Sequence, residues 1–156
     1  MAPPLTKEVL ALDAAAEAAR IAAFIRDTVV GFHRRGVVLG ISGGVDSSVC
    51  LALAVQALGP SKVCALMMPE TDSAGHSARR AAEVARQFGV TPITENIAAP
   101  LEALGCYARR DAAIAAVVPG YGRGWKSKIA IAGGKDGAFN YFKLVTESPA
   151  GERAEC

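Results

Sequence analysis

The sequence predicts an α/β domain with a parallel sheet, and three observations support that fold class. Short apolar runs at residues 37–41, 62–68 and 90–97 alternate with helical segments, which is the pattern of βαβ units. The first run shows no apolar–polar alternation, which is typical of a parallel strand covered on both faces. The chain has 156 residues, of which 51% are hydrophobic and 21% charged. This is enough apolar sequence for a folded core, so we expect residues 1–156 to form a single domain.

The helical segments follow from their spacing and their ends. From residue 6 to about residue 30 the chain is alanine-rich, and apolar residues recur at steps of three and four, at Ala14, Ala18, Ile21, Ile25 and Val29. That spacing gives one apolar stripe along an amphipathic helix. Further helices are predicted at residues 45–58 and 77–88, each followed by a glycine.

The composition changes in the second half of the chain. Residues 100–118 are predicted to be helical, and after residue 119 the sequence is rich in glycine, lysine and aromatic residues. We expect a short antiparallel β insertion there, with strands at 129–131 and 139–146 around a turn at 133–137. The Ser-Pro-Ala-Gly stretch at 148–151 predicts a turn that feeds a returning strand. Because few residues follow it, we expect the chain to be the N-terminal part of a longer domain, with an incomplete sheet.

Charge, cysteine content and hydropathy argue against several classes of protein. The net charge of +2 is too small to favour a nucleic-acid partner. No apolar run is long enough to cross a bilayer, so no membrane partner is expected. The four cysteines lie far apart, and Cys50 and Cys64 stand inside apolar runs. We interpret these two as reduced core residues, which indicates a cytoplasmic protein.

The stretch SGGVDS at residues 42–47 lies where the first predicted strand passes into a helix. Such a turn presents backbone N–H groups and a helix N-terminus to an anion. Its two glycines let a phosphate approach the backbone closely, and its serines add hydroxyl donors. Asp46 would repel a phosphate unless it holds Mg²⁺, which bridges carboxylate and phosphate. The stretch therefore predicts a phosphate site with Asp46 as a metal ligand.

Three other motifs explain this stretch less well. The Walker A loop needs a lysine, and none stands between Gly40 and Ser48. The dinucleotide fingerprint G-x-G-x-x-G is absent. Residues 40–44 do satisfy G-x-S-x-G, the nucleophile elbow of serine hydrolases. That fold also needs a later acid and then a histidine, and His76 is the only histidine after the motif.

The SGGVDS stretch resembles the pyrophosphate-binding loop, S-G-G-x-D-S, of the N-type ATP pyrophosphatases. Further stretches are similar to NAD synthase in its shorter form without a glutaminase domain, namely MMPETDS (67–73), GCYARRDAAI (105–114) and YGRGWKSKI (121–129). The similarity spans roughly residues 10–152. It implies a flavodoxin-like, doubly wound sheet of the adenine-nucleotide hydrolase type. It also implies a ligase that transfers AMP from ATP to the carboxylate of deamido-NAD and lets ammonia displace the AMP, giving NAD.

The resemblance also implies ligands and partners for particular residues. The implied ATP-binding residues are Gly40, Ile41, Ser42, Gly43, Gly44, Val45, Asp46, Ser47 and Met68. Asp46 is the implied Mg²⁺ ligand, and no catalytic side chain is assigned. ATP and Mg²⁺ are the implied cofactors, deamido-NAD and ammonia the substrates, and a homodimer the assembly. Segments of the family's second half supply further contacts, so this chain alone is expected to bind nucleotide without making NAD.

Other functions remain open at this point. One is another ATP pyrophosphatase, either tRNA-modifying or similar to GMP synthase, and another is a nucleotide-binding fragment without turnover. The segment 105–135 also carries interleaved basic and aromatic side chains, namely Arg109, Arg110, Arg123, Lys126, Lys128 and Lys135 with Tyr107, Tyr121 and Trp125. This composition allows an RNA-binding surface but is more typical of a solvated face or a subunit contact.

Overall fold

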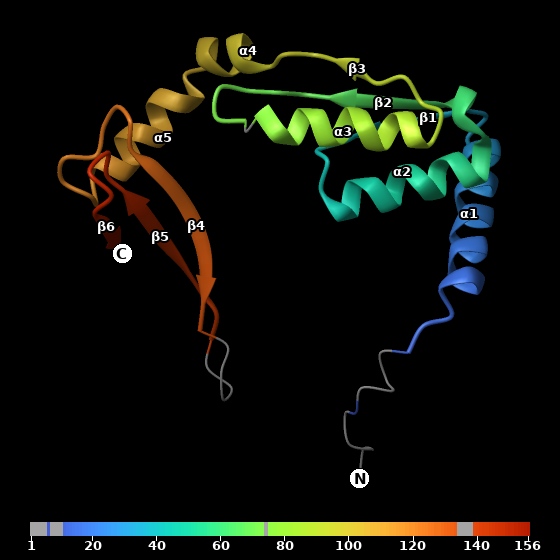
Figure 1. Ribbon diagram of the computed structural model, residues 1–156, viewed down its shortest axis with the longest axis horizontal. Helices are drawn as coiled ribbons and strands as arrows, with labels where there is room; N and C mark the ends of the chain where they lie inside the picture. Colours follow the sequence, from blue (N-terminus) through green and yellow to red (C-terminus); the bar gives the residue numbers. More distant parts are fainter. Residues whose placement is uncertain (1–5, 7–10, 74, 134–138) are drawn as a thin grey trace. The chain divides into compact units, whose positions relative to one another are not determined.

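The computed structural model describes residues 6, 11–73, 75–133 and 139–156 (Figure 1). The chain divides into two compact units, Met1–Ala98 and Ala99–Cys156, and each unit is described by itself. The expectation of a single domain stays a prediction. Most of the predicted turn at 133–137, including Lys135, falls outside the described residues. None of the described helices is long and apolar enough to cross a membrane.

The first unit contains a parallel three-stranded sheet. Its strands, β1 (Val37–Gly40), β2 (Val63–Met67) and β3 (Ile93–Thr94), lie in the order β1-β2-β3. The connections are α2 (Val45–Leu58) with a short 3-10 helix, η2 (Pro60–Lys62), and then α3 (Gly75–Gln87). These are the two βαβ units that the alternation of the sequence predicts. The helix prediction for residues 45–58 is confirmed at both ends.

One face of this sheet carries the hydrophobic core. Val37 is the register partner of Val63, and Leu39 that of Ala65, so these side chains share a face. Helices α2 and α3 contact this sheet and each other on the same side (Figure 1). Leu51 of α2 and Ala65 of β2 are both 0% exposed. Right-handed crossovers between strands added in one direction place successive helices on one face, which explains this one-sided packing.

The opposite face of the sheet is open, so the expectation of a strand covered on both faces is wrong. Val38 is 71% exposed and Ile93 is 54% exposed. Their register partners on β2, Cys64 and Leu66, point to the same face. Within the described residues no strand pairs with β1 on the side away from β2. A helix that connects the sheet to a strand at that position would cover this face. An apolar run thus indicates that a strand can be buried, but it does not show that both faces of the strand are covered.

The interpretation of two cysteines as core residues is also wrong. Cys64 is half-buried on the open face of the sheet, and Cys50 is exposed on α2. The buried residues of α2 are Leu51, Ala54 and Ala57, at helical spacing. Cys50 lies on the same side of the helix as Ala54 and Ala57 but one turn nearer the helix start, where its side chain is exposed. All four cysteines are free thiols in the structure.

The first helix, α1 (Ala14–Gly31), packs against α2. It begins later than the predicted start at residue 6, because the carboxylate of Asp13 caps it. Asp13 Oδ1 accepts hydrogen bonds from the N–H groups of Ala15 and Ala16 at 3.1 and 3.0 Å. Val29 of the predicted stripe is buried, as expected of the face toward α2.

The third strand is much shorter than predicted. Only Ile93–Thr94 pairs with β2, whereas Val90 is a buried core residue outside any strand. Beyond β3 the N–H of Glu95 donates to the carbonyl O of Met67 at 2.8 Å, and that of Ile97 donates to Pro69 at 3.0 Å. The chain therefore follows the end of β2 without a continuous strand.

Two helices, the first of which begins at the boundary between the units, replace the single helix predicted over residues 100–118. They are α4 (Ala98–Ala103) and α5 (Cys106–Ala115). Gly105 separates them at φ 69°, a left-handed conformation that a right-handed helix cannot contain. Asn96 Oδ1 accepts a hydrogen bond from the N–H of Ala98 at 2.9 Å and so caps the start of α4.

An antiparallel sheet completes the second unit, as the sequence predicts after residue 119. Strand β5 (Tyr141–Glu147) lies between β4 (Lys126–Ala132) and β6 (Arg153–Glu155). The predicted turn is confirmed, since the N–H of Gly151 donates to the carbonyl O of Ser148 at 2.9 Å. The predicted returning strand is also present and is β6.

Candidate functional site

Residues 41–44 form the turn between β1 and α2, at the carboxyl end of β1. The N–H of Ile41 donates to the carbonyl O of Leu66 on β2 at 2.9 Å, which ties the start of the turn to the sheet. Gly43 then adopts φ 78°, a conformation that glycine reaches without strain. Gly44 is the N-cap of α2. The predicted order of strand, glycine turn and helix is therefore confirmed.

Hydroxyl groups hold this turn in shape. Ser42 Oγ accepts a hydrogen bond from the N–H of Gly44 at 3.3 Å and lies 3.2 Å from Ser47 Oγ. Ser47 Oγ accepts from the N–H of Ser42 at 3.3 Å and donates to the carbonyl O of Gly44 at 3.1 Å. Ser48 Oγ donates to the same carbonyl at 2.7 Å. The serines therefore preorganise the loop, a role that the sequence reasoning did not assign to them.

The start of α2 presents backbone donors and one carboxylate. The first N–H groups of a helix, here those of residues 45–47, have no intrahelical acceptor. The N-cap residue is Gly44, which has no side chain that could accept a hydrogen bond from these groups. Asp46 lies in this first turn and is exposed, and its carboxylate has no partner among the residues that the structure describes. An anion can thus meet the N–H groups, while a cation can meet the carboxylate.

The two glycines of the loop differ in their surroundings. A Cβ atom at Gly43 would lie 2.8 Å from the carbonyl O of Ser77 and 2.9 Å from the backbone N of Ala81, both on α3. A Cβ atom at Gly44 would meet only Ser42 Oγ, at 3.4 Å. Packing against α3 therefore requires a glycine at position 43, whereas the space beside Gly44 is open to an approaching group.

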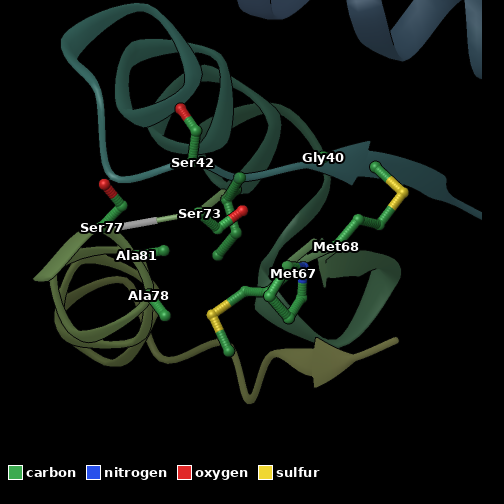
Figure 2. Close-up of a pocket in the computed structure, with 10 residues that line it drawn as sticks. Gly40, Ser42, Met67, Met68, Ser73, Ser77, Ala78 and Ala81 are labelled. Carbon is green, nitrogen blue, oxygen red and sulfur yellow. The ribbon is translucent and has the colours of Figure 1, made fainter. Parts of the chain in front are cut away.

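A cavity of about 350 Å³ lies beside this loop (Figure 2). Its walls come from the end of β1, the end of β2 with the residues after it, and α3. It is lined by Gly40, Ile41, Ser42, Met67, Met68, Pro69, Ser73, Ser77, Ala78 and Ala81. The lining is mostly apolar, with hydroxyl groups from both the loop and α3 (Figure 2). Cavities of this size and character hold small molecules with an apolar body and a few polar atoms.

The predicted ATP-binding residues fall into two groups. Four of them line the cavity, namely Gly40, Ile41, Ser42 and Met68. The others form the rest of the loop and the start of α2, and they are Gly43, Gly44, Val45, Asp46 and Ser47. The side chain of Ile41 belongs to the buried core, so this residue contributes to the cavity wall but has no side chain free to bind a ligand.

Sequence reasoning missed the contribution of α3 to the site. Ser77, Ala78 and Ala81 line the cavity from the first half of that helix. The available signal was the cluster of small residues at the start of a helix that follows the second strand. Ligands of open α/β sheets bind at the carboxyl edge of the strands, where such residues leave room.

The metal-binding role predicted for Asp46 depends on which other groups could bind the same ion. Within the described residues, no group of three or more His, Cys, Asp or Glu side chains could hold a metal ion. Mg²⁺ is often bound by one or two protein carboxylates, with phosphate oxygens and water as the other ligands. An exposed carboxylate beside free N–H groups fits that mode of binding, in which the nucleotide supplies the remaining ligands.

The basic segment at residues 105–135 is partly neutralised by its neighbours. Arg110 pairs with Asp111 at 2.9 Å, and Lys126 pairs with Glu147 of β5 at 2.9 Å. These ion pairs reduce the charge available to a polyanion. An RNA-binding surface here therefore gains no support from the described contacts and stays a hypothesis.

A family model and the curated relatives of this chain all indicate the same family. The family model described as NAD synthase matches residues 17–117. The chain is 48% identical over 149 residues to the NH(3)-dependent NAD(+) synthetase of Rhizobium meliloti (strain 1021), covering 95% of this chain and 45% of the relative. It is 46% identical over 151 residues to the protein of that name from Rhizobium rhizogenes (strain K84 / ATCC BAA-868), covering 96% and 46%. The chain thus spans about half the length of these relatives.

Solved structures give the same family. One is the glutamine-dependent NAD+ synthetase of Acinetobacter baumannii in complex with adenosine diphosphate, at 35% identity and a TM-score of 0.57, covering 70% of this chain and 20% of that one. Another is the NH3-dependent NAD synthetase of Campylobacter jejuni, at 29% identity and a TM-score of 0.57, covering 62% and 42%. The matched region includes the glycine turn, the start of α2 and the cavity beside them. This chain belongs to the NAD synthase family.

Proposed function

We propose that this chain binds Mg-ATP for an NAD synthase, with the pyrophosphate portion on the loop at residues 41–48. The observation that carries the proposal is the loop itself, a preorganised turn that ends in an uncapped helix start with an exposed carboxylate. The family match at residues 17–117 contains this loop. A similar solved structure is described as a complex with adenosine diphosphate, which supports a nucleotide as the ligand.

The proposed reaction has two steps. A carboxylate oxygen of deamido-NAD attacks the α-phosphorus of ATP, and the bond from that phosphorus to pyrophosphate breaks. Ammonia then attacks the acyl carbon, AMP leaves with the electron pair of its bond, and one proton is released. The Rhizobium relatives are named for ammonia, which supports ammonia as the nitrogen donor.

The chain's own residues would act on the first step. Negative charge grows on the pyrophosphate as its bond to the α-phosphorus breaks, and the N–H groups of residues 45–47 would stabilise that charge. Because Ser42 and Ser47 already hold the loop, little reorganisation would be needed as the charge develops. Mg²⁺ held by Asp46 would neutralise phosphate charge when bound. The cavity lined by Met67 and Ala81 would take the adenosine portion.

We propose that the complete reaction also needs residues of the kind found in the unmatched part of the Rhizobium meliloti relative, of which the match covers 45%. The acceptor carboxylate has to be oriented as well as the ATP, and orientation supplies about 7–11 kcal/mol of such a two-substrate barrier. We therefore propose that the present chain binds Mg-ATP and forms no NAD from deamido-NAD and ammonia. A homodimer and a cytoplasmic location are proposed from the family resemblance alone.

The experiment that tests nucleotide binding is a calorimetric titration of the 156-residue chain with Mg-ATP. The Asp46→Asn variant should fold as the parent does and bind Mg-ATP more weakly by about 1–3 kcal/mol, the scale of losing a charged partner. Asp27→Asn changes an exposed carboxylate on α1 and is the matched control, with no expected effect on binding. Equal affinities of the parent and Asp46→Asn would refute the metal role, and a parent chain that does not bind Mg-ATP would refute the proposed function.

A further inference from the structure

The glycine loop has no positive side chain of its own. No lysine or arginine stands between Arg35 and Lys62, a stretch that includes β1, the loop and all of α2. Asp46 adds a negative charge at the same place. A bound triphosphate or a departing pyrophosphate carries several negative charges, which N–H dipoles and one divalent ion balance only in part. A cation from another element of the first unit would complete the charge balance.

Helix α3 is the element that packs on the loop. A Cβ atom at Gly43 would lie 2.8 Å from the Cβ of Arg80, as close as to the carbonyl O of Ser77. The root of the Arg80 side chain therefore lies directly beside the loop backbone. Ser77, one helical turn before Arg80 on α3, and Ala81, the residue after it, line the cavity next to the loop. The loop and Arg80 thus keep a fixed separation, because the contact involves backbone rather than flexible side-chain ends.

Arg80 is also not engaged elsewhere. Its side chain is exposed, and among the residues that the structure describes it makes no hydrogen bond or ion pair. Arg86 on the same helix differs, since its Nε donates to the carbonyl O of Ala82 at 3.1 Å. The side chain of Arg80 starts beside the phosphate loop, and a planar guanidinium with free donors has the chemistry to bind two phosphate oxygens at once.

We propose that Arg80 is a phosphate-binding residue that supplies the cation missing from the glycine loop and binds the pyrophosphate portion of ATP. The proposal rests on the proposed function of the loop. It assigns to α3 a role in charge balance, in addition to its packing against Gly43. The ligand class is a nucleoside triphosphate or free pyrophosphate, and a nucleoside monophosphate lacks the atoms that Arg80 would contact.

The test compares three probes, Mg-ATP, Mg-pyrophosphate and AMP, by calorimetric titration of the 156-residue chain. Arg80→Gln should weaken the binding of Mg-ATP and Mg-pyrophosphate about tenfold or more, the range for losing a charge-assisted hydrogen bond. AMP affinity should not change. Arg80→Lys should recover part of the loss, since it keeps the charge but not the planar fork. Thermal unfolding of each variant checks that the fold is retained.

Arg79→Gln is the matched control, because it removes the same charge from the neighbouring position without touching the Gly43 contact. A tenfold loss in Arg79→Gln as well would show a general field effect and overturn the assignment to Arg80. Unchanged pyrophosphate affinity in Arg80→Gln would overturn it too, while leaving the proposed function intact if the parent binds Mg-ATP. A parent chain that binds none of the three probes would refute the proposed function, and the assignment with it.

Discussion

The two compact units are stabilised in different ways. The first unit buries an apolar core between one face of its parallel sheet and two helices, with Leu51 at 0% exposure. The second unit pairs its strands with antiparallel hydrogen bonds and ion pairs, while Ile131 and Phe142, which face each other across β4 and β5, are 71% and 78% exposed. One face of the first unit's sheet therefore stabilises the unit through burial of apolar side chains, whereas Ile131 and Phe142 of the second unit lie on an open face.

The largest expected effect would test this difference directly. Leu51→Ala removes a fully buried side chain and should lower the free energy of unfolding by about 2–5 kcal/mol. Ile131→Ala removes an exposed side chain of similar size and should change it by less than about 0.5 kcal/mol. Urea unfolding followed by circular dichroism measures both. A loss from Ile131→Ala as large as that from Leu51→Ala would show that the open face of the second unit is covered in solution.

A somewhat smaller effect would show how far the packing of the first unit extends toward its loop. Gly43→Ala combines a left-handed backbone with contacts to α3 that are too short, and should cost about 2–3 kcal/mol of stability. Gly44→Ala meets neither problem and should cost less than about 1 kcal/mol, the scale of a weaker N-cap. Thermal unfolding of the two variants side by side tests this. Equal losses would mean that neither the left-handed backbone nor the contact with α3 makes position 43 less tolerant of a Cβ atom than position 44.

The smallest expected effect concerns the ion pairs of the second unit. Hydrogen bonds from Lys126 and then Arg153 lower the pKa of the Glu147 carboxyl from its ordinary value of 4.5. A carboxyl with a lowered folded-state pKa stabilises the fold above its unfolded pKa and loses that contribution as the pH falls through the folded value. The pairing of β4, β5 and β6 should therefore weaken only on acidification below pH 4.5.

Carbon-detected nuclear magnetic resonance of the Glu147 carboxyl across an acid titration measures this shift. The midpoint should lie below 4.5, and Lys126→Ala should move it upward, because the largest cause of the lowered pKa is removed. A midpoint that Lys126→Ala leaves in place would show that the Lys126–Glu147 pair does not persist in solution.

Sequence reasoning succeeded where local chemistry decides the structure. Residues 42–47 predict the turn and the helix start because glycine, serine and aspartate have specific backbone and capping behaviour. It failed where a distant element decides. Nothing local at Val38 shows that its face lacks a covering helix, and nothing local at Gly43 shows that α3 packs on it. The cavity was only partly predicted for the same reason, since Ser77 and Ala81 reach it through the fold of α3.

The exposed position of β1 has a consequence for hydrogen exchange. The N–H of Ile41 points to β2, and because backbone amides alternate along a strand, those of Val38 and Gly40 point away from it. Within the described residues no strand accepts these two bonds, so both amides should exchange with deuterated solvent far faster than that of Leu39. Slow exchange at Val38 and Gly40 would thus report a chain segment bound along this edge, beside the strand that carries the phosphate loop.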